Sequence, residues 1–114
     1  VKIPLASDAD DLDGDQKAKV TKYLAEGIKW AEADDFQMAA QNWEKALDAS
    51  GGKSASALWN IAAYKWYSGD MDGAEKYFKR SFSNGGSDWA DAAKRSLWAT
   101  FRKEKDRKES EGGN

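Results

Sequence analysis

The sequence predicts an all-α protein of about five helices that pack as antiparallel pairs. Three observations predict this class. The single proline, Pro4, lies near the N-terminus, and the helix-favouring residues Ala, Lys, Glu and Leu are spread through the rest of the 114 residues. Apolar residues recur at spacings of about three and four, and no sustained alternation of β-branched residues indicates a strand. A pattern of small and aromatic residues also returns after about 34 to 35 residues.

The composition argues against several classes of function. The chain has no cysteine and no histidine, which removes thiolate chemistry and the commonest general base and metal ligand. We therefore expect no enzymatic activity, no cofactor and no metal site. The formal net charge of -2 argues against nucleic-acid binding, which needs a basic face.

The sequence contains no membrane-length run of about 18 apolar residues, so we expect a soluble protein without membrane insertion. Its first residue, Val1, is compatible with more than one compartment. The protein is expected to be cytoplasmic, or periplasmic or secreted if Val1 follows a cleaved signal.

Residues 1–15 are predicted to form a flexible, acidic N-terminal tail. The stretch 8–15 is rich in aspartate, which invites interpretation as a calcium-binding loop. That pattern fails, because placing Gly14 at the glycine position of such a loop puts Ala9 and Val20 where carboxylates are needed. We interpret the stretch as a solvated linker whose last residue, Asp15, caps the first helix.

The first two helices are predicted over 16–33 and 36–49. Gly27 lies inside the first helix, where glycine costs about 1 kcal/mol relative to alanine, so its presence indicates that another helix comes close. Asp34-Asp35 breaks the first helical pattern and caps the second helix. Ser50-Gly51-Gly52 ends the second helix.

Two further helices are predicted over 54–67 and 71–83. Ser68-Gly69-Asp70 forms the turn between them, and Asn84-Gly85-Gly86 ends the fourth helix. Both helices carry an apolar stripe at helical spacing, which predicts that each packs against neighbours.

The last helix is predicted over 89–108, with Ser87 or Asp88 as its cap. Its apolar residues stop at Phe101, and the sequence beyond is charged on every face. We expect a frayed helix end that passes into a disordered tail over 110–114.

The two helix pairs align on each other. The matched positions are Tyr23 with Leu58, Gly27 with Ala62, Ala39 with Ala74, Trp43 with Phe78, Ala46 with Ser81, and Leu47 with Phe82. Small residues at these positions let helix backbones approach, and aromatic residues fill the space beside them. Each unit alone leaves an apolar face uncovered, so the units are expected to stack.

The better-preserved unit, Ala55 to Ser83, resembles a tetratricopeptide repeat (TPR). The residues that carry the resemblance are Leu58, Asn60, Ala62, Gly69-Asp70, Ala74, Phe78 and Ser81. The earlier unit matches at Tyr23, Gly27, Trp30, Ala39, Trp43 and Ala46, with Asp34-Asp35 at its turn. Neither unit ends in the proline usual in the family; Gly-Gly stands there both times.

This resemblance covers roughly 65 residues and implies a short right-handed α-solenoid. One domain over 16–109 would then hold repeats at about 20–53 and 55–86 and a capping helix at about 88–108, which covers the last exposed face.

The resemblance also implies a concave groove, lined by the first helix of each unit, that holds a peptide or helix from a partner. Carried onto this chain, the groove residues are Leu24, Ile28, Trp59, Asn60, Ala63, Trp66 and Tyr67, with Lys94, Leu97 and Phe101 as candidates from the last helix. Leu24 and Ile28 stand where chaperone-binding members have lysine and asparagine, so a carboxylate clamp is not expected. An aromatic-rich groove instead suits an apolar or amphipathic segment.

Two alternatives to this groove stay open. Trp59, Trp66 and Tyr67 could be covered by the chain itself, through the last helix or the N-terminal Ile3-Pro4-Leu5. They could also be buried in a homodimer, which would make the protein a structural self-association unit. The main hypothesis is a protein–protein interaction module that acts as a scaffold or adaptor, with a protein or peptide as its partner.

Overall fold

The computed structural model describes residues 5–7 and 12–112. These residues form five helices and no strand, which confirms the predicted all-α class. The helices are α1 (Gly14–Glu32), α2 (Phe36–Ala49), α3 (Ala55–Tyr67), α4 (Met71–Trp89) and α5 (Ala92–Gly112). Within the described ranges, no helix is both long enough and apolar enough to cross a membrane.

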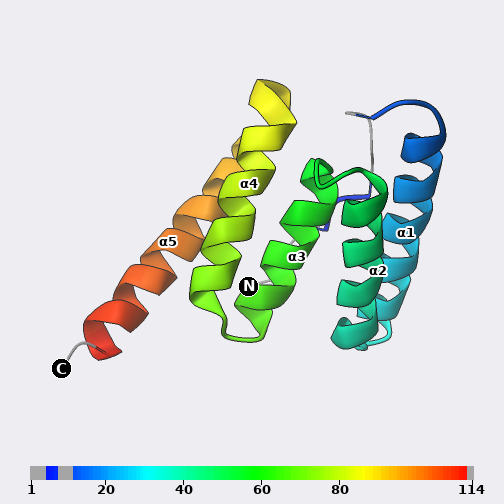
Figure 1. The fold of residues 1–114 in the computed structure, drawn as a ribbon. Coiled ribbons are helices and arrows are strands. Elements are labelled where there is room, and N and C mark those ends of the chain that lie inside the picture. Colours follow the sequence, from blue (N-terminus) through cyan, green and yellow to red (C-terminus); the bar gives the residue numbers. More distant parts are fainter. Residues whose placement is uncertain (1–4, 8–11, 113–114) are drawn as a thin grey trace.

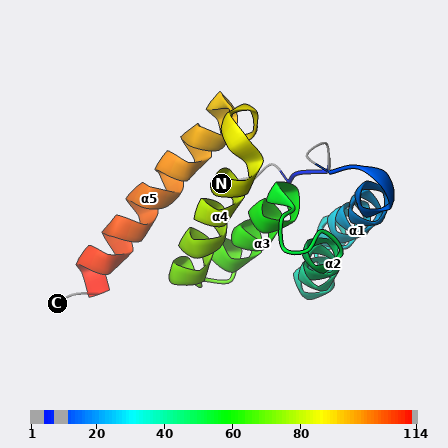
Figure 2. The same cartoon turned by 45° about the horizontal axis from the view of Figure 1, so that its top comes forward.

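The helices follow one another across the molecule in chain order. Helices α1 and α2 form one closely packed pair, α3 and α4 form a second pair, and α2 packs against α3. Helix α5 lies at the α4 end of the molecule, opposite the α1–α2 end (Figure 1, Figure 2). The molecule is elongated, with dimensions of 50 × 31 × 21 Å. The right-handed twist of a solenoid stays a prediction.

Side-chain caps fix the starts of α2, α3 and α4. Asp35 accepts a hydrogen bond from the backbone N–H of Met38 at 3.1 Å, as predicted for the start of α2. Ser54 and Asp70 cap α3 and α4 in the same way. Helix α1 differs from its prediction, because it begins at Gly14 after Asp13, and the Asp13 side chain makes no capping hydrogen bond.

The end of α4 also differs from its prediction. Helical structure continues past Asn84 to Trp89, with a kink at Gly86, whose φ of 78° only glycine adopts easily. Because the φ and ψ of Gly86 (78° and -173°) are non-helical, Gly86 divides α4 into two helical pieces, and the first piece ends at the predicted Asn84-Gly85-Gly86. The departure from the prediction is the short helical piece that follows, up to Trp89. The next helix starts at Ala92 and not at Trp89, because the Asp91 carboxylate accepts the backbone N–H of Lys94 at 2.9 Å.

The N- and C-terminal boundaries are more ordered than the sequence predicted. Helix α5 continues to Gly112, so residues 110–112 are helical and not part of a tail. Residues 5–7 of the predicted N-terminal tail pack against the helices. The predicted tail segments 1–4, 8–11 and 113–114 lie outside the described residues, as do Ile3 and Pro4 of the predicted docking segment and part of the aspartate-rich stretch.

Two hydrophobic clusters form the interior. The first cluster lies between α1, α2 and α3 and contains Val20, Leu24, Ala31, Ala39, Trp43, Ala46, Ala57 and Ile61. The second cluster lies between α3, α4 and α5 and contains Trp59, Ala62, Trp66, Ala74, Phe78, Leu97 and Phe101. Helix α3 contributes to both clusters, so it is the element that joins the two halves of the molecule.

Helix α3 is buried around its whole circumference over most of its length. Every residue from Ala55 to Ala63 is buried, including the polar Ser56 and Asn60. A helix with no solvent-facing stripe needs neighbours on every side. The α1–α2 pair covers one side of α3. Helices α4 and α5 cover another side, and the remaining face of α3 meets residues 5–7.

The matched positions of the two units are buried in the same way. Gly27 and Ala62 are both buried, as are Trp43 and Phe78, which lie opposite them in the partner helices. A methyl group at Gly27 would come within 3.0 Å of three atoms of the Trp43 indole ring. The close approach predicted at Gly27 is therefore present. Among the described residues, the buried Trp43 indole N–H has no hydrogen-bond partner.

Helix α5 is attached to the rest of the molecule in two different ways along its length. Near its start, large rings pack together: Trp98 lies 5.9 Å from Phe78 and 6.0 Å from Phe82, and Phe101 lies 5.2 Å from Trp66. Such edge-on and stacked aromatic contacts add stability beyond their buried area. The apolar residues run out at Phe101, as the sequence predicted.

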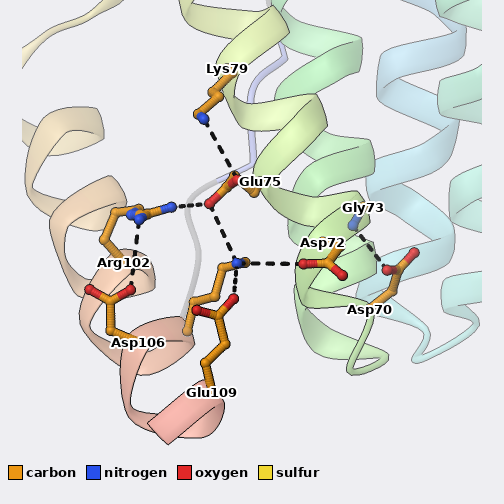
Figure 3. Close-up of polar contacts among 9 residues, drawn as sticks. Asp70, Asp72, Gly73, Glu75, Lys79, Arg102, Asp106 and Glu109 are labelled. Atoms are coloured by element: carbon orange, nitrogen blue, oxygen red, sulfur yellow. Dashed lines mark hydrogen bonds and ion pairs between the residues drawn. The ribbon is translucent and has the colours of Figure 1, made fainter. Parts of the chain in front are cut away.

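Beyond Phe101, ion pairs hold α5 against α4 (Figure 3). Lys105 is only 7 % exposed and lies 3.5 Å from Asp72 and 3.7 Å from Glu75, both on α4. Lys105 also pairs with Glu109, and Arg102 pairs with Glu75. The hydrogen bond to Glu109 raises the pKa of Lys105, and the same bond lowers the pKa of Glu109.

We expect Gly27→Ala to lower the free energy of unfolding. The added methyl group meets the Trp43 indole, at a cost of about 1–3 kcal/mol for overpacking, and the better helix propensity of alanine returns up to about 1 kcal/mol. Urea unfolding followed by circular dichroism measures the loss. The double variant Gly27→Ala/Trp43→Phe recreates the Ala62 and Phe78 combination of the second unit and should recover stability. Additive effects of the two changes would contradict this explanation.

We expect acid to loosen the end of α5. Because the pKa of Glu109 is lowered in the folded protein, its contribution is present above its ordinary pKa and is lost as pH falls through the lowered value. Because the pKa of Lys105 is raised, its contribution is present below its ordinary pKa and is lost as pH rises through the raised value.

The indole N–H of Trp66, which donates to Glu104 on α5 at 2.9 Å, reports this loosening by NMR. Lys105→Gln should loosen α5 already at neutral pH. It should also remove the pH dependence that Glu109 contributes to the attachment of α5. The control Arg107→Gln breaks an exposed pair with Glu111 on the same helix and should change little. Equal effects of the two variants would argue against the ion-pair attachment.

Candidate functional site

Most of the residues predicted to line a partner-binding groove are buried by the chain itself. The buried members are Leu24, Trp59, Asn60, Ala63, Trp66, Leu97 and Phe101. Ile28 and Lys94 are half-buried, and Tyr67 is 70 % exposed. The seven buried side chains therefore do not offer a free surface, and the predicted set is divided between two clusters and the solvent.

Aromatic side chains of α4 and α5 cover Trp59 and Trp66. The Trp59 ring lies 4.9 Å from Phe78, 5.8 Å from Phe82 and 6.4 Å from Trp89. The Trp66 ring lies 5.2 Å from Phe101, and its N–H donates to a carboxylate of α5. Burial by the chain, one of the two alternatives that the sequence left open, is the arrangement found for these two rings.

The buried side chain of Asn60 is hydrogen-bonded to the backbone near the N-terminus. Its Oδ1 accepts the backbone N–H of Ala6 at 2.8 Å, and its Nδ2 donates to the backbone carbonyl of Ala6 at 2.9 Å. One side-chain amide thus binds both polar groups of one backbone residue. These bonds join positions that are 54 residues apart in the sequence.

Residues 5–7, which we call the N-terminal segment, pass over the face of α3 that carries Asn60. Leu5 packs against the first cluster and Ala6 packs against the second. Ser7 is exposed. The segment is neither helix nor strand and bridges the boundary between the two halves of the molecule.

The burial of Asn60 explains why the N-terminal segment must bind there. The Asn60 side chain is fully buried, and an amide taken out of water without hydrogen bonds is strongly unfavourable. Both its donor and its acceptor are satisfied by Ala6. These contacts involve only the backbone of Ala6, so the site recognises a polypeptide backbone in an aligned position and does not itself read the side chain.

A pocket of about 250 Å³ lies beside the N-terminal segment. It is lined by Leu5, Ala6, Ser7, Trp89, Asp91, Ala93 and Lys94. The Lys94 ammonium lies 3.1 Å from the Asp91 carboxylate and 4.1 Å from the centre of the Trp89 ring. The hydrogen bonds from the backbone and the side chain of Lys94 lower the pKa of Asp91, so its carboxylate stays ionised.

Two exposed aromatic side chains lie near the turns within the two helix pairs. Tyr67 stacks on Phe36 with 4.5 Å between ring centres, and Trp30 is 37 % exposed. Tyr67 is the one member of the predicted groove whose ring is mainly in solvent. Two such exposed side chains form a limited patch.

The described residues contain no group of three or more Asp or Glu side chains placed to hold a metal ion. Most of the charged side chains of α4 and α5 that could carry chemistry are paired with one another, as in the Lys105 and Arg102 network (Figure 3). The arrangement beside Asn60 is a buried side-chain amide hydrogen-bonded to a polypeptide backbone.

Sequence reasoning identified Asn60 and left open that Ile3-Pro4-Leu5 covers this helix, but it missed Ala6 as the partner of Asn60. The signal was a short apolar stretch ending at Leu5 ahead of the acidic residues, which was assigned to the tail. Three residues are too few for a periodic pattern, and backbone recognition leaves no trace in side-chain identity.

Comparison with known proteins gives no relative. No protein-family model, no curated protein and no solved structure matches the chain. The function is therefore inferred from the site itself.

We expect Asn60→Leu, which keeps the branched shape of the side chain, to release the N-terminal segment. Loss of two buried hydrogen bonds should lower the free energy of unfolding by about 1–3 kcal/mol and should speed hydrogen exchange at the Ala6 amide. Asn42→Leu is the matched control, because the Asn42 side chain donates only to Met38 within its own helix. Unchanged exchange at Ala6 in Asn60→Leu would contradict the assignment.

Proposed function

We propose that the protein is a protein–protein interaction module that binds an extended polypeptide segment of a partner on the face of α3 that the N-terminal segment covers. The observation that carries this proposal is the pair of hydrogen bonds from the buried Asn60 amide to the backbone of Ala6. In a module of this kind, backbone hydrogen bonds give affinity, and neighbouring side-chain contacts give specificity.

The surroundings of Asn60 support this proposal. The N-terminal segment bridges two hydrophobic clusters, so an external segment in the same position would bury one apolar side chain on each side. The backbone contacts do not depend on the identity of the bound residue, so another sequence could replace Leu5-Ala6-Ser7. A scaffold or adaptor function needs no further chemistry.

The resemblance to tetratricopeptide repeats supports the same function. Asn60 lies on the first helix of the better-preserved unit, the helix that in this family faces the ligand. The proposal departs from the groove predicted from sequence in one respect. Trp59 and Trp66 of α3 are part of the interior, and the ligand is expected to contact Asn60 and the boundary between the clusters.

Self-association is a second candidate function, and one observation favours it. Tyr67 and Trp30 are the exposed large apolar side chains at the turn end, away from Asn60. A dimer formed through this patch would not compete with a segment bound at Asn60. Light scattering with and without added peptide separates the two functions, because the peptide would leave such a dimer unchanged.

A peptide of residues 1–7 added to the full-length protein tests the proposal. The variant Leu5→Ser/Ala6→Pro weakens the attached segment, since proline at position 6 lacks the N–H that Asn60 accepts. We expect calorimetry to show that the peptide binds this variant at least about tenfold more tightly than it binds the wild type, where the site is already covered. A peptide with N-methylated Ala6 is the matched control and should lose about tenfold in affinity, because it cannot donate that hydrogen bond.

A second measurement covers the case in which the variant folds poorly. Excess peptide added to the wild type should speed hydrogen exchange at the protein's own Ala6 amide, because the peptide takes its place on Asn60. The proposal is wrong if neither protein binds the peptide, or if the N-methylated peptide binds as well as the unmodified one.

A further inference from the structure

The N-terminal segment leaves space unfilled beside Ala6. A pocket of about 250 Å³ lies between the segment and the corner where α4 meets α5, and Ala6 forms part of its wall. The methyl group of Ala6 packs against the second cluster, and Trp89 packs on the same cluster. Because Ala6 and Trp89 line the same pocket, a longer side chain at the position of Ala6 has this space next to it.

The walls of the pocket combine apolar side chains with one pair of opposite charges. Trp89, Ala93 and Leu5 supply its apolar surface. Its two charged residues, Asp91 and Lys94, neutralise each other through an ion pair of 3.1 Å. Because these two charges are paired with each other, a neutral side chain in the pocket meets no unpaired charge.

The Trp89 ring also shows how a ligand could be held. The Lys94 ammonium lies over it at 4.1 Å from the ring centre, and the ring N–H donates to Ser81, which fixes the ring in place. A fixed ring beside an open space favours contact with a second aromatic ring in a stacked or edge-on arrangement.

We propose that the partner segment has a large aromatic residue where this chain has Ala6, preceded by a large apolar residue at the position of Leu5, and that the aromatic side chain fills the pocket beside Trp89. This inference rests on the proposed function and specifies its ligand. The Leu5 position packs on the first cluster, Asn60 holds the backbone of the next residue, and the pocket receives that residue's side chain.

The proposal gives the N-terminal segment a defined place in binding. Alanine satisfies Asn60 but leaves the pocket open, so the chain's own segment is a weak occupant held by its covalent attachment. A partner that also fills the pocket gains additional buried apolar surface and can displace the segment.

Two peptides tested on the full-length Leu5→Ser/Ala6→Pro variant decide the question. One has the natural sequence of residues 1–7, and the other has phenylalanine in place of Ala6. We expect calorimetry to show the phenylalanine peptide binding at least about tenfold more tightly. If the two affinities are equal, the pocket has no role and the inference is wrong, while the proposed function stands. If neither peptide binds, the proposed function is wrong as well.

Ala93→Leu tests whether the phenylalanine side chain binds in the pocket, because the larger leucine narrows the pocket from the side of α5. It should remove most of the advantage of the phenylalanine peptide and leave the natural peptide little changed. Ala99→Leu is the matched control, since Ala99 is exposed on the same helix and is not part of the pocket wall. An advantage that survives Ala93→Leu unchanged would contradict the proposed position of the aromatic ring.

The intact chain offers a test without any peptide. Ala6→Phe in the otherwise natural protein should fill the pocket from within the same molecule and raise the midpoint of thermal unfolding by a few degrees. A lower midpoint would show that the space beside Ala6 does not accept a ring and would overturn the inference.

Discussion

The structure depends on the complete burial of one helix. From Ala55 to Ala63, every residue of helix α3 is buried, so each side of the helix must be matched by another part of the chain. The α1–α2 pair packs on the side of α3 that carries Ala57 and Ile61. Helices α4 and α5 pack on the side that carries Trp59 and Trp66. The face that remains is polar at Asn60 and is completed by the backbone of Ala6.

The sequence was most informative where structure is local. The bounds of α2 and its Asp35 cap were predicted correctly, because a cap and an apolar stripe involve residues a few positions apart. Gly27 was correctly interpreted as a point of close approach, since a glycine inside a helix is unfavourable unless a neighbouring group needs the space of its missing side chain. Gly85-Gly86 was correctly interpreted as a helix end, because the non-helical backbone of Gly86 divides α4, but the short helical piece that follows up to Trp89 was not predicted.

The candidate site was only half predictable. Asn60 was identified through the resemblance to tetratricopeptide repeats, but its partner is a backbone that is 54 residues away, and backbone groups are the same in every sequence. The aromatic residues were harder still. A helix buried on all sides and a helix lining an open groove have the same composition, so the sequence could not decide which neighbours Trp59 and Trp66 contact. The charged end of α5 presented the opposite difficulty, because its contacts with α4 are ion pairs that no apolar pattern reveals.

The contact between Ala6 and Asn60 also determines how the molecule should unfold. In a linear stack of helical units each unit touches only its neighbours, so the ends can melt separately. Here residues 5 and 6 pack on the two clusters, and α3 cannot lose its contacts with α1 and α2, or those with α4 and α5, without exposing a side that has no polar stripe. The two pairs should therefore melt in a single cooperative transition, and the folding rate should be limited by closure of the long loop between Ala6 and Asn60 and not by helix formation.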